Sequence, residues 1–133
     1  MVIAVDPEAP TPVYRQIVSQ LRRAIAGGEI APGDSLPTVR HLADELGVNF
    51  NTVANAYRAL AEEGLVETHQ GRGARVIASS KPKPDDAAAR EALGSFLAEM
   101  VLADRSDEQI LTMVEEALRE IREGGEAASA DER

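Results

Sequence analysis

The sequence predicts a mainly α-helical fold with one small β-hairpin, and three observations lead to this fold class. Apolar residues recur at helical spacing in five segments of the 133-residue chain, with turn-forming residues between them. A short β-prone segment, Leu65–Ala78, contains two glycines at a bend. Alternating prolines in the stretch KPKPDD exclude both a helix and a central strand, so this stretch separates three helices and the hairpin from two further helices.

The first three helices are predicted from apolar stripes and from residues that begin or end helices. The first covers residues 11–26. The second has Pro37 in its first turn and ends at Gly47, and the third is capped by Asn49 and ends at Gly64. We expect the core-facing residues to be Ile17, Leu21, Ile25, Val39, Leu42, Ala43, Leu46, Val53, Tyr57 and Leu60.

The fourth and fifth helices follow the proline-rich stretch. Asp85 or Asp86 can cap the fourth helix, and Ser106 with Gln109 has the spacing of a capping box for the fifth. The glycine pair 124–125 is expected to end the fifth helix. Their apolar stripes comprise Leu93, Phe96, Leu97, Met100 and Val101, then Ile110, Met113, Val114, Leu118 and Ile121.

These elements predict four parts in the chain. Residues 10–80 form a helical domain with the hairpin, and residues 81–84 form a linker. Residues 85–123 form a helical pair, and residues 124–133 form a disordered tail. A lone pair of short helices leaves part of each apolar stripe exposed, so we expect residues 85–123 to dimerise, with two pairs packed as a four-helix arrangement.

Composition excludes several classes of function. The chain has no cysteine, so it has neither disulfides nor thiolate nucleophiles. Its two histidines, His41 and His69, lie far apart in the chain without matching ligand spacing, so we expect no metal, no cofactor and no enzymatic activity. The N-terminus lacks the pattern of a secretion signal, and no apolar stretch approaches the ~20 residues of a membrane span. We therefore expect a cytoplasmic protein.

The formal net charge of −9 at first argues against a nucleic-acid partner. Its distribution answers part of that objection. Residues 1–80 carry seven basic and nine acidic residues, whereas residues 81–133 carry seven and fourteen. The N-terminal part is close to neutral and can bind DNA if its cations share one face.

The order of helix, turn, helix and hairpin is that of a winged helix-turn-helix, whose last helix fits the DNA major groove. When the core-facing residues of this helix are set aside, the residues that remain are polar and suit base contacts. Asparagine pairs with adenine, and arginine suits guanine or phosphate. A solvated face, with Asn49 only a helix cap, is the alternative interpretation. The candidate contact residues on this helix are Asn49, Asn51, Thr52, Asn55 and Arg58.

Further candidates lie outside this helix. Arg40 could bind a phosphate, or it could pair with Asp44 four residues later. Gln70, Arg72 and Arg75 surround the hairpin bend, and Arg72 could enter a minor groove or meet a phosphate. An ordinary polar turn is the alternative for that bend.

The segment from Pro12 to Val76, which includes PGDSLPTVRHLADELGVN and NTV..AY..L..EGL, closely resembles the DNA-binding domain of GntR-family regulators. The NxNTV start and the two-helix tail are most similar to the YtrA-like subfamily. The chain departs from the family pattern at Phe50 and Ala54, where other members often carry a basic residue. The resemblance implies DNA contacts at Arg40, Asn49, Asn51, Thr52, Gln70 and Gly71.

Together these observations predict a sequence-specific transcriptional regulator, a repressor that binds a two-fold symmetric operator as a homodimer. The alternative is a winged-helix module for protein contacts with an acidic docking tail. About forty ordered residues after the linker are too few to enclose a ligand, so any effector would bind at the dimer interface or against the winged helix.

Overall fold

The computed structural model describes residues 2–69, 73–77 and 85–131. Contacts divide the chain into two units, of which the first comprises Met1–Pro82 with Ile121–Arg133 and the second comprises Lys83–Glu120. The predicted linker, residues 81–84, lies outside the described residues.

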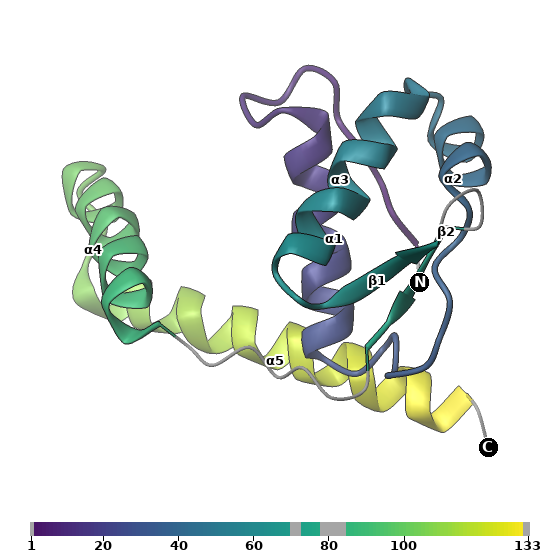
Figure 1. Cartoon of the computed structure of the whole chain (residues 1–133). Coiled ribbons are helices and arrows are strands. Elements are labelled where there is room, and N and C mark those ends of the chain that lie inside the picture. The colour runs from purple at the N-terminus through teal and green to yellow at the C-terminus, as the bar shows by residue number, and fades with distance from the viewer. Residues whose placement is uncertain (1, 70–72, 78–84, 132–133) are drawn as a thin grey trace. The chain divides into compact units, whose positions relative to one another are not determined.

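Within residues 2–69 and 73–77, the first unit contains three helices and an antiparallel hairpin (Figure 1). They are α1 (Val13–Ala26), α2 (Val39–Leu46), α3 (Phe50–Glu62), β1 (Val66–His69) and β2 (Gly73–Val76). Helix α3 is the central element, since it contacts α1, α2 and β1. This arrangement confirms the predicted winged helix-turn-helix, although the strands are shorter than the predicted hairpin.

The residues at the ends of these helices show which of the predicted caps and helix ends are present. The Asn49 side chain caps α3 as predicted, because its Oδ1 accepts a hydrogen bond from the Asn51 backbone N–H at 2.8 Å. Gly47 ends α2 in the left-handed conformation, with φ 68°. The placement of Pro37 in the first turn of α2 is wrong. Thr38 is the cap, and its Oγ1 accepts from the backbone N–H of His41 at 3.1 Å, which leaves the proline just before the helix.

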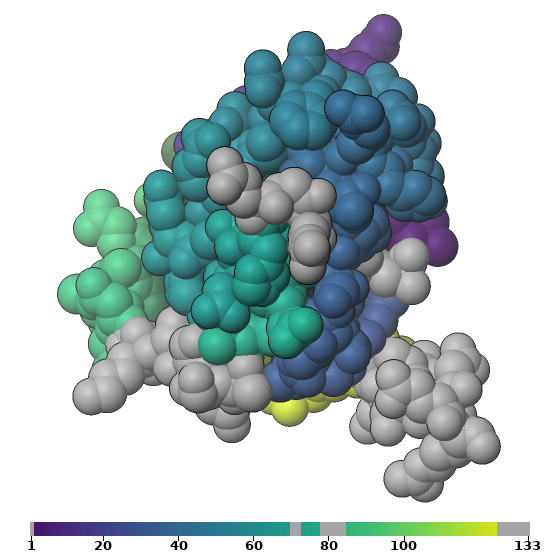
Figure 2. Space-filling view, turned by 45° about the vertical axis from the view of Figure 1, so that its right-hand side comes forward, coloured from purple at the N-terminus to yellow at the C-terminus, as the bar shows by residue number. Residues whose placement is uncertain are grey.

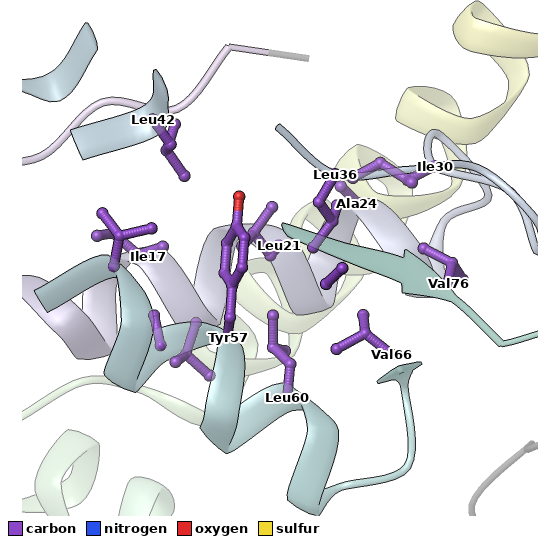
Figure 3. Close-up of a cluster of buried hydrophobic side chains, with 14 of the residues drawn as sticks. Ile17, Leu21, Ala24, Ile30, Leu36, Leu42, Tyr57, Leu60, Val66 and Val76 are labelled. Atoms are coloured by element: carbon purple, nitrogen blue, oxygen red, sulfur yellow. The ribbon is translucent and has the colours of Figure 1, made fainter. Parts of the chain in front are cut away.

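The hydrophobic core of the first unit lies between α1, α3 and the hairpin (Figure 3). The predicted stripes are buried, except that Ile25, Val39 and Leu46 are only partly so. The Tyr57 ring stands within the cluster, and its hydroxyl donates a hydrogen bond to the Pro37 carbonyl oxygen at 2.7 Å. Burial raises the pKa of the Tyr57 phenol well above its ordinary value, so the hydroxyl keeps its proton.

The segment before α2 pairs with the hairpin, a contact that the sequence analysis did not predict. Ser35 forms a β-bridge with Arg75, and the Leu36 N–H donates to the Ala74 carbonyl oxygen at 2.7 Å. The hairpin is therefore anchored to the start of the helix-turn-helix, so its orientation is set by the backbone.

Two glutamines of α1 hold the N-terminal segment. Gln20 exchanges two hydrogen bonds with the backbone of Ala4, its Oε1 accepting at 3.0 Å and its Nε2 donating at 2.6 Å. Gln16 does the same with Asp6, at 2.8 Å each, and Nε2 also donates to Thr11. Because the two side chains lie one helical turn apart, they bind successive parts of an extended segment, as a neighbouring strand would.

The remaining helices are α4 (Asp86–Leu102) and α5 (Asp107–Asp131). Asp85 caps α4 as predicted, since its Oδ1 accepts hydrogen bonds from two backbone N–H groups of the first turn. The predicted capping box is also present. The Ser106 N–H donates to Gln109 Oε1 at 2.9 Å, and the Gln109 N–H donates to Ser106 Oγ at 3.1 Å.

The predicted end of α5 at the glycine pair 124–125 is wrong, because helical backbone continues to Asp131. Each glycine costs only about 1 kcal/mol relative to alanine inside a helix, and alanines and a glutamate follow this pair. Most of the segment predicted to be a disordered tail, 124–133, is thus helical.

The apolar stripes of α4 and α5 are only partly buried in the single chain. Helix α4 contributes no buried residue, and Leu93 and Val101 remain 51% and 61% exposed. In α5, Ile110 is buried while Leu118 is 48% exposed. None of the helices in the described part of the chain has the length and apolar character needed to cross a membrane.

Candidate DNA-binding surface

The start of α2, one side of α3 and the hairpin border a hollow of about 690 Å³, which we call the α3 hollow. Figure 2 shows these elements on one face of the molecule, with α2 in blue and α3 and the hairpin in teal. The described residues that line the hollow include two arginines and no acidic residue. They are Thr38, Val39, Arg40, Phe50, Ala54, Tyr57, Arg58, Ala61, Thr68, His69 and Gly73.

Gly73 allows the hairpin to approach α2 closely. Its φ is +81°, and a Cβ at this position would lie 3.0 Å from the Pro37 carbonyl oxygen and 3.2 Å from Thr38 Cα. A side chain here would therefore push the hairpin away from the α2 end of the hollow. The other glycine of the predicted bend, Gly71, lies outside the described residues, as do Gln70 and Arg72.

The polar residues predicted on α3 are accessible. Asn51, Asn55 and Arg58 are exposed, and Thr52 is partly exposed. Arg58 Nη1 donates a hydrogen bond to Asn55 Oδ1 at 3.2 Å, which holds the two side chains together on one face. Asn49 is also exposed, but its Oδ1 caps the helix, so its amide N–H₂ is the group left for a ligand.

Two of the three arginines predicted outside α3, Arg40 and Arg75, are described by the structure and have different surroundings. Arg40 is exposed and borders the α3 hollow together with Arg58. Among the described residues no ion pair joins Arg40 to Asp44, the alternative that the spacing left open. Arg75 is exposed on β2, opposite Glu67 in the strand register.

The acidic residue after the end of α3 is neutralised within the unit. Both Glu63 carboxylate oxygens accept hydrogen bonds from the Arg22 guanidinium, one of them at 3.2 Å. Because this carboxylate is paired, it opposes an anionic ligand less than a free carboxylate would. Among the described residues that line the α3 hollow, Arg40 and Arg58 are the two that carry a permanent charge.

Sequence reasoning missed one part of this surface. Phe50 is 51% exposed and lines both the α3 hollow and a second hollow of about 300 Å³ that also contacts Arg40. Its position outside the apolar stripe of α3 was the available signal. That Arg40 and Arg58 border the same hollow depends on how α2 packs against α3, which their spacing in the sequence does not give.

The fold and this surface define a winged helix-turn-helix DNA-binding domain, in which an accessible polar helix adjoins a short hairpin. Residues 13–76 match the family described as bacterial regulatory proteins, gntR family. The protein belongs to the GntR family, as the sequence predicted.

Two relatives illustrate the similarity. The chain is 43% identical over 79 residues to the HTH-type transcriptional repressor YtrA of Bacillus subtilis, a match that covers 59% of this chain and 61% of YtrA. It is 41% identical over 95 residues to the HTH-type transcriptional regulator Rv1152 of Mycobacterium tuberculosis, covering 71% of this chain and 76% of that protein. Both relatives are transcriptional regulators by name.

Solved structures agree with this assignment. YtrA from Sulfolobus acidocaldarius, a GntR-family transcription factor, is similar with a TM-score of 0.61 and 38% identity, over 74% of this chain and 99% of that chain. AraR(DBD) in complex with operator ORX1 is similar with a TM-score of 0.52 and 28% identity, over 58% and 99% of the two chains.

Proposed function

We propose that the protein is a transcriptional repressor that binds a two-fold symmetric operator as a homodimer. The observation that carries the proposal is the exposed polar face of α3 beside a hollow whose described lining has two arginines and no acidic residue. The similar AraR domain forms a complex with operator DNA, which supports the same role here.

In this proposal α3 lies in the major groove. Asn51 and Asn55 would contact base edges, with Thr52 beside them, because asparagine matches the donor and acceptor of adenine. Arg58 would contact guanine or a phosphate, and Arg40 would bind a phosphate from the start of α2. The Asn49 amide, Arg75 and the hairpin residues Gln70, Gly71 and Arg72 would complete the contacts with the backbone or minor groove.

Dimerisation would use the stripes of α4 and α5. Leu93, Val101 and Leu118 keep about half or more of their surface exposed in the single chain, which suits them to bury that surface against a second copy. One short helix reads too few base pairs for useful specificity, so a dimer explains how the operator would be selected. The other proposed interface residues are Phe96, Leu97, Met100 and Val114. Ile110, also predicted there, is already buried in the single chain and has little surface left to bury against a second copy.

An effector, if the protein has one, would bind at the dimer interface or against the winged helix. The two helices of residues 85–123 cannot alone surround a ligand pocket of several hundred Å³. The protein would work in the cytoplasm, where its operator would be located.

Selection from a random DNA library with the full-length protein, followed by binding titrations at several salt concentrations, tests this function. We expect a two-fold symmetric sequence to be enriched. Asn51→Ala should weaken its binding by ~1–3 kcal/mol and relax the preference at one base pair. Arg58→Ala should weaken binding, whereas Arg90→Ala, which removes an exposed arginine of α4, should not.

Two results would contradict the proposal. The first is a library from which no sequence is enriched. The second is an Asn51→Ala protein whose affinity and base preference both equal those of the wild type, because α3 would then not be reading bases.

A further inference from the structure

The start of α3 carries an apolar surface that the polar contacts proposed above do not use. Phe50 is the first residue of α3, lies outside the core cluster and is 51% exposed. Ala54 follows one helical turn later, is partly exposed and lines the same hollow. The two side chains form what we call the apolar step, Phe50 with Ala54.

The surroundings of the apolar step indicate the chemistry of its ligand. Arg40 and Arg58 border the same hollow, so a ligand in it meets an apolar patch together with two cationic side chains. Double-stranded DNA presents this combination in its major groove, where the thymine C5-methyl group lies between two phosphate backbones. Phenylalanine and alanine side chains both make favourable apolar contacts with that methyl group.

We infer that the apolar step selects thymine at one position of each half-site by packing against its C5-methyl group. The inference rests on the proposed function, that is, on α3 lying in the major groove. Residues near the N-terminus of a recognition helix reach base edges, and Phe50 is the first residue of α3. Adjacent helical residues point about 100° apart, so Phe50 and Asn51 contact different bases.

Replacing thymine by deoxyuridine tests this inference, because the change removes only the methyl group and keeps the hydrogen-bonding groups. The operator selected by the full-length protein is resynthesised with deoxyuridine at each thymine in turn, and the affinity is measured by titration. We expect one position per half-site at which wild-type affinity falls about fourfold, which corresponds to about 0.8 kcal/mol for one buried methyl group. Deoxyuridine at a thymine outside the selected operator sequence is the DNA control.

Two variants assign the effect to Phe50. Phe50→Ala should bind the thymine and deoxyuridine operators with equal affinity at that position. Phe50→Leu keeps an apolar side chain and should retain most of the difference. Thermal unfolding of both variants checks that they remain folded, which half exposure of the ring favours.

The outcomes separate this inference from the proposed function. A wild-type protein that selects no DNA sequence contradicts both. Selective binding with no loss at any deoxyuridine position overturns the inference alone. A Phe50→Ala protein that still loses about fourfold in affinity on deoxyuridine substitution also overturns it, because the larger side chain of the apolar step would then make no contact with the methyl group. Unchanged affinity and base preference in Phe50→Ala likewise overturns the inference, because the ring would then contribute nothing to DNA recognition.

Discussion

Replacing Gly73 with alanine should damage the protein in two separable ways. The residue has φ +81°, a conformation that costs an L-residue about 1–2 kcal/mol. The new Cβ would also lie 3.0 Å from the Pro37 carbonyl oxygen and 3.3 Å from that of Leu36, and these backbone atoms cannot rotate away as a side chain can. Relieving such crowding costs about 1–3 kcal/mol, so the free energy of unfolding should fall by ~2–5 kcal/mol in total.

Gly33→Ala is the matched control for this change. Gly33 has φ +93°, but a Cβ there would meet no atom within 4 Å, so only the conformational cost of about 1–2 kcal/mol applies. Urea denaturation of the two full-length variants measures the difference. Because the contact at Gly73 joins the hairpin to the start of α2, Gly73→Ala should also weaken operator binding more than Gly33→Ala does.

Two results would contradict the predicted difference between Gly73→Ala and Gly33→Ala. Equal losses of unfolding free energy in the two variants would mean that crowding of the added Cβ against the Pro37 backbone does not lower the stability. Equal operator affinities would mean that the hairpin position does not affect DNA binding.

Two further predictions concern the core and the dimer. Tyr57→Phe should lower the free energy of unfolding by about 1 kcal/mol, since it removes the hydrogen bond to Pro37. Because the pKa of Tyr57 is raised in the folded protein, above pH ~10 the Tyr57 phenol loses its proton only in the unfolded state. The free energy of unfolding of the wild type should therefore fall more steeply above pH ~10 than that of Tyr57→Phe, as measured by urea denaturation at several pH values. Leu118→Glu should convert a dimer near twice 14.2 kDa into a monomer. Leu111→Glu should not, because Leu111 is exposed but lies outside the predicted stripe. Light scattering that finds no difference in mass between the two variants would contradict the predicted interface.

Local chemistry explains which parts of the fold the sequence could predict. The Asn49 cap and the Ser106–Gln109 box depend on residues within one turn of each other, so a pattern in the sequence is sufficient. The Ser35–Arg75 bridge and the Gln20 contacts with Ala4 join distant segments, and no local pattern specifies them.

The same distinction applies to the candidate site. Subtracting the buried stripe of α3 correctly left Asn51, Asn55 and Arg58 exposed, because helical periodicity fixes which face a residue occupies. The α3 hollow combines residues from α2, α3 and the hairpin, so its composition depends on tertiary packing. The exposed Phe50 ring became interpretable only when its neighbours in the hollow were known.

The charge distribution determines how such a protein can recognise DNA. With a net charge of −9, the chain as a whole repels the phosphate backbone, and a second copy doubles that charge. Near α3 the balance differs, because Glu63 is paired with Arg22 and the described lining of the hollow has no acidic residue. Attraction to DNA is therefore local and weak for arbitrary sequences, since non-specific binding comes from phosphate contacts. Discrimination must then come mainly from base contacts, which places the selectivity in the exposed side chains of α3.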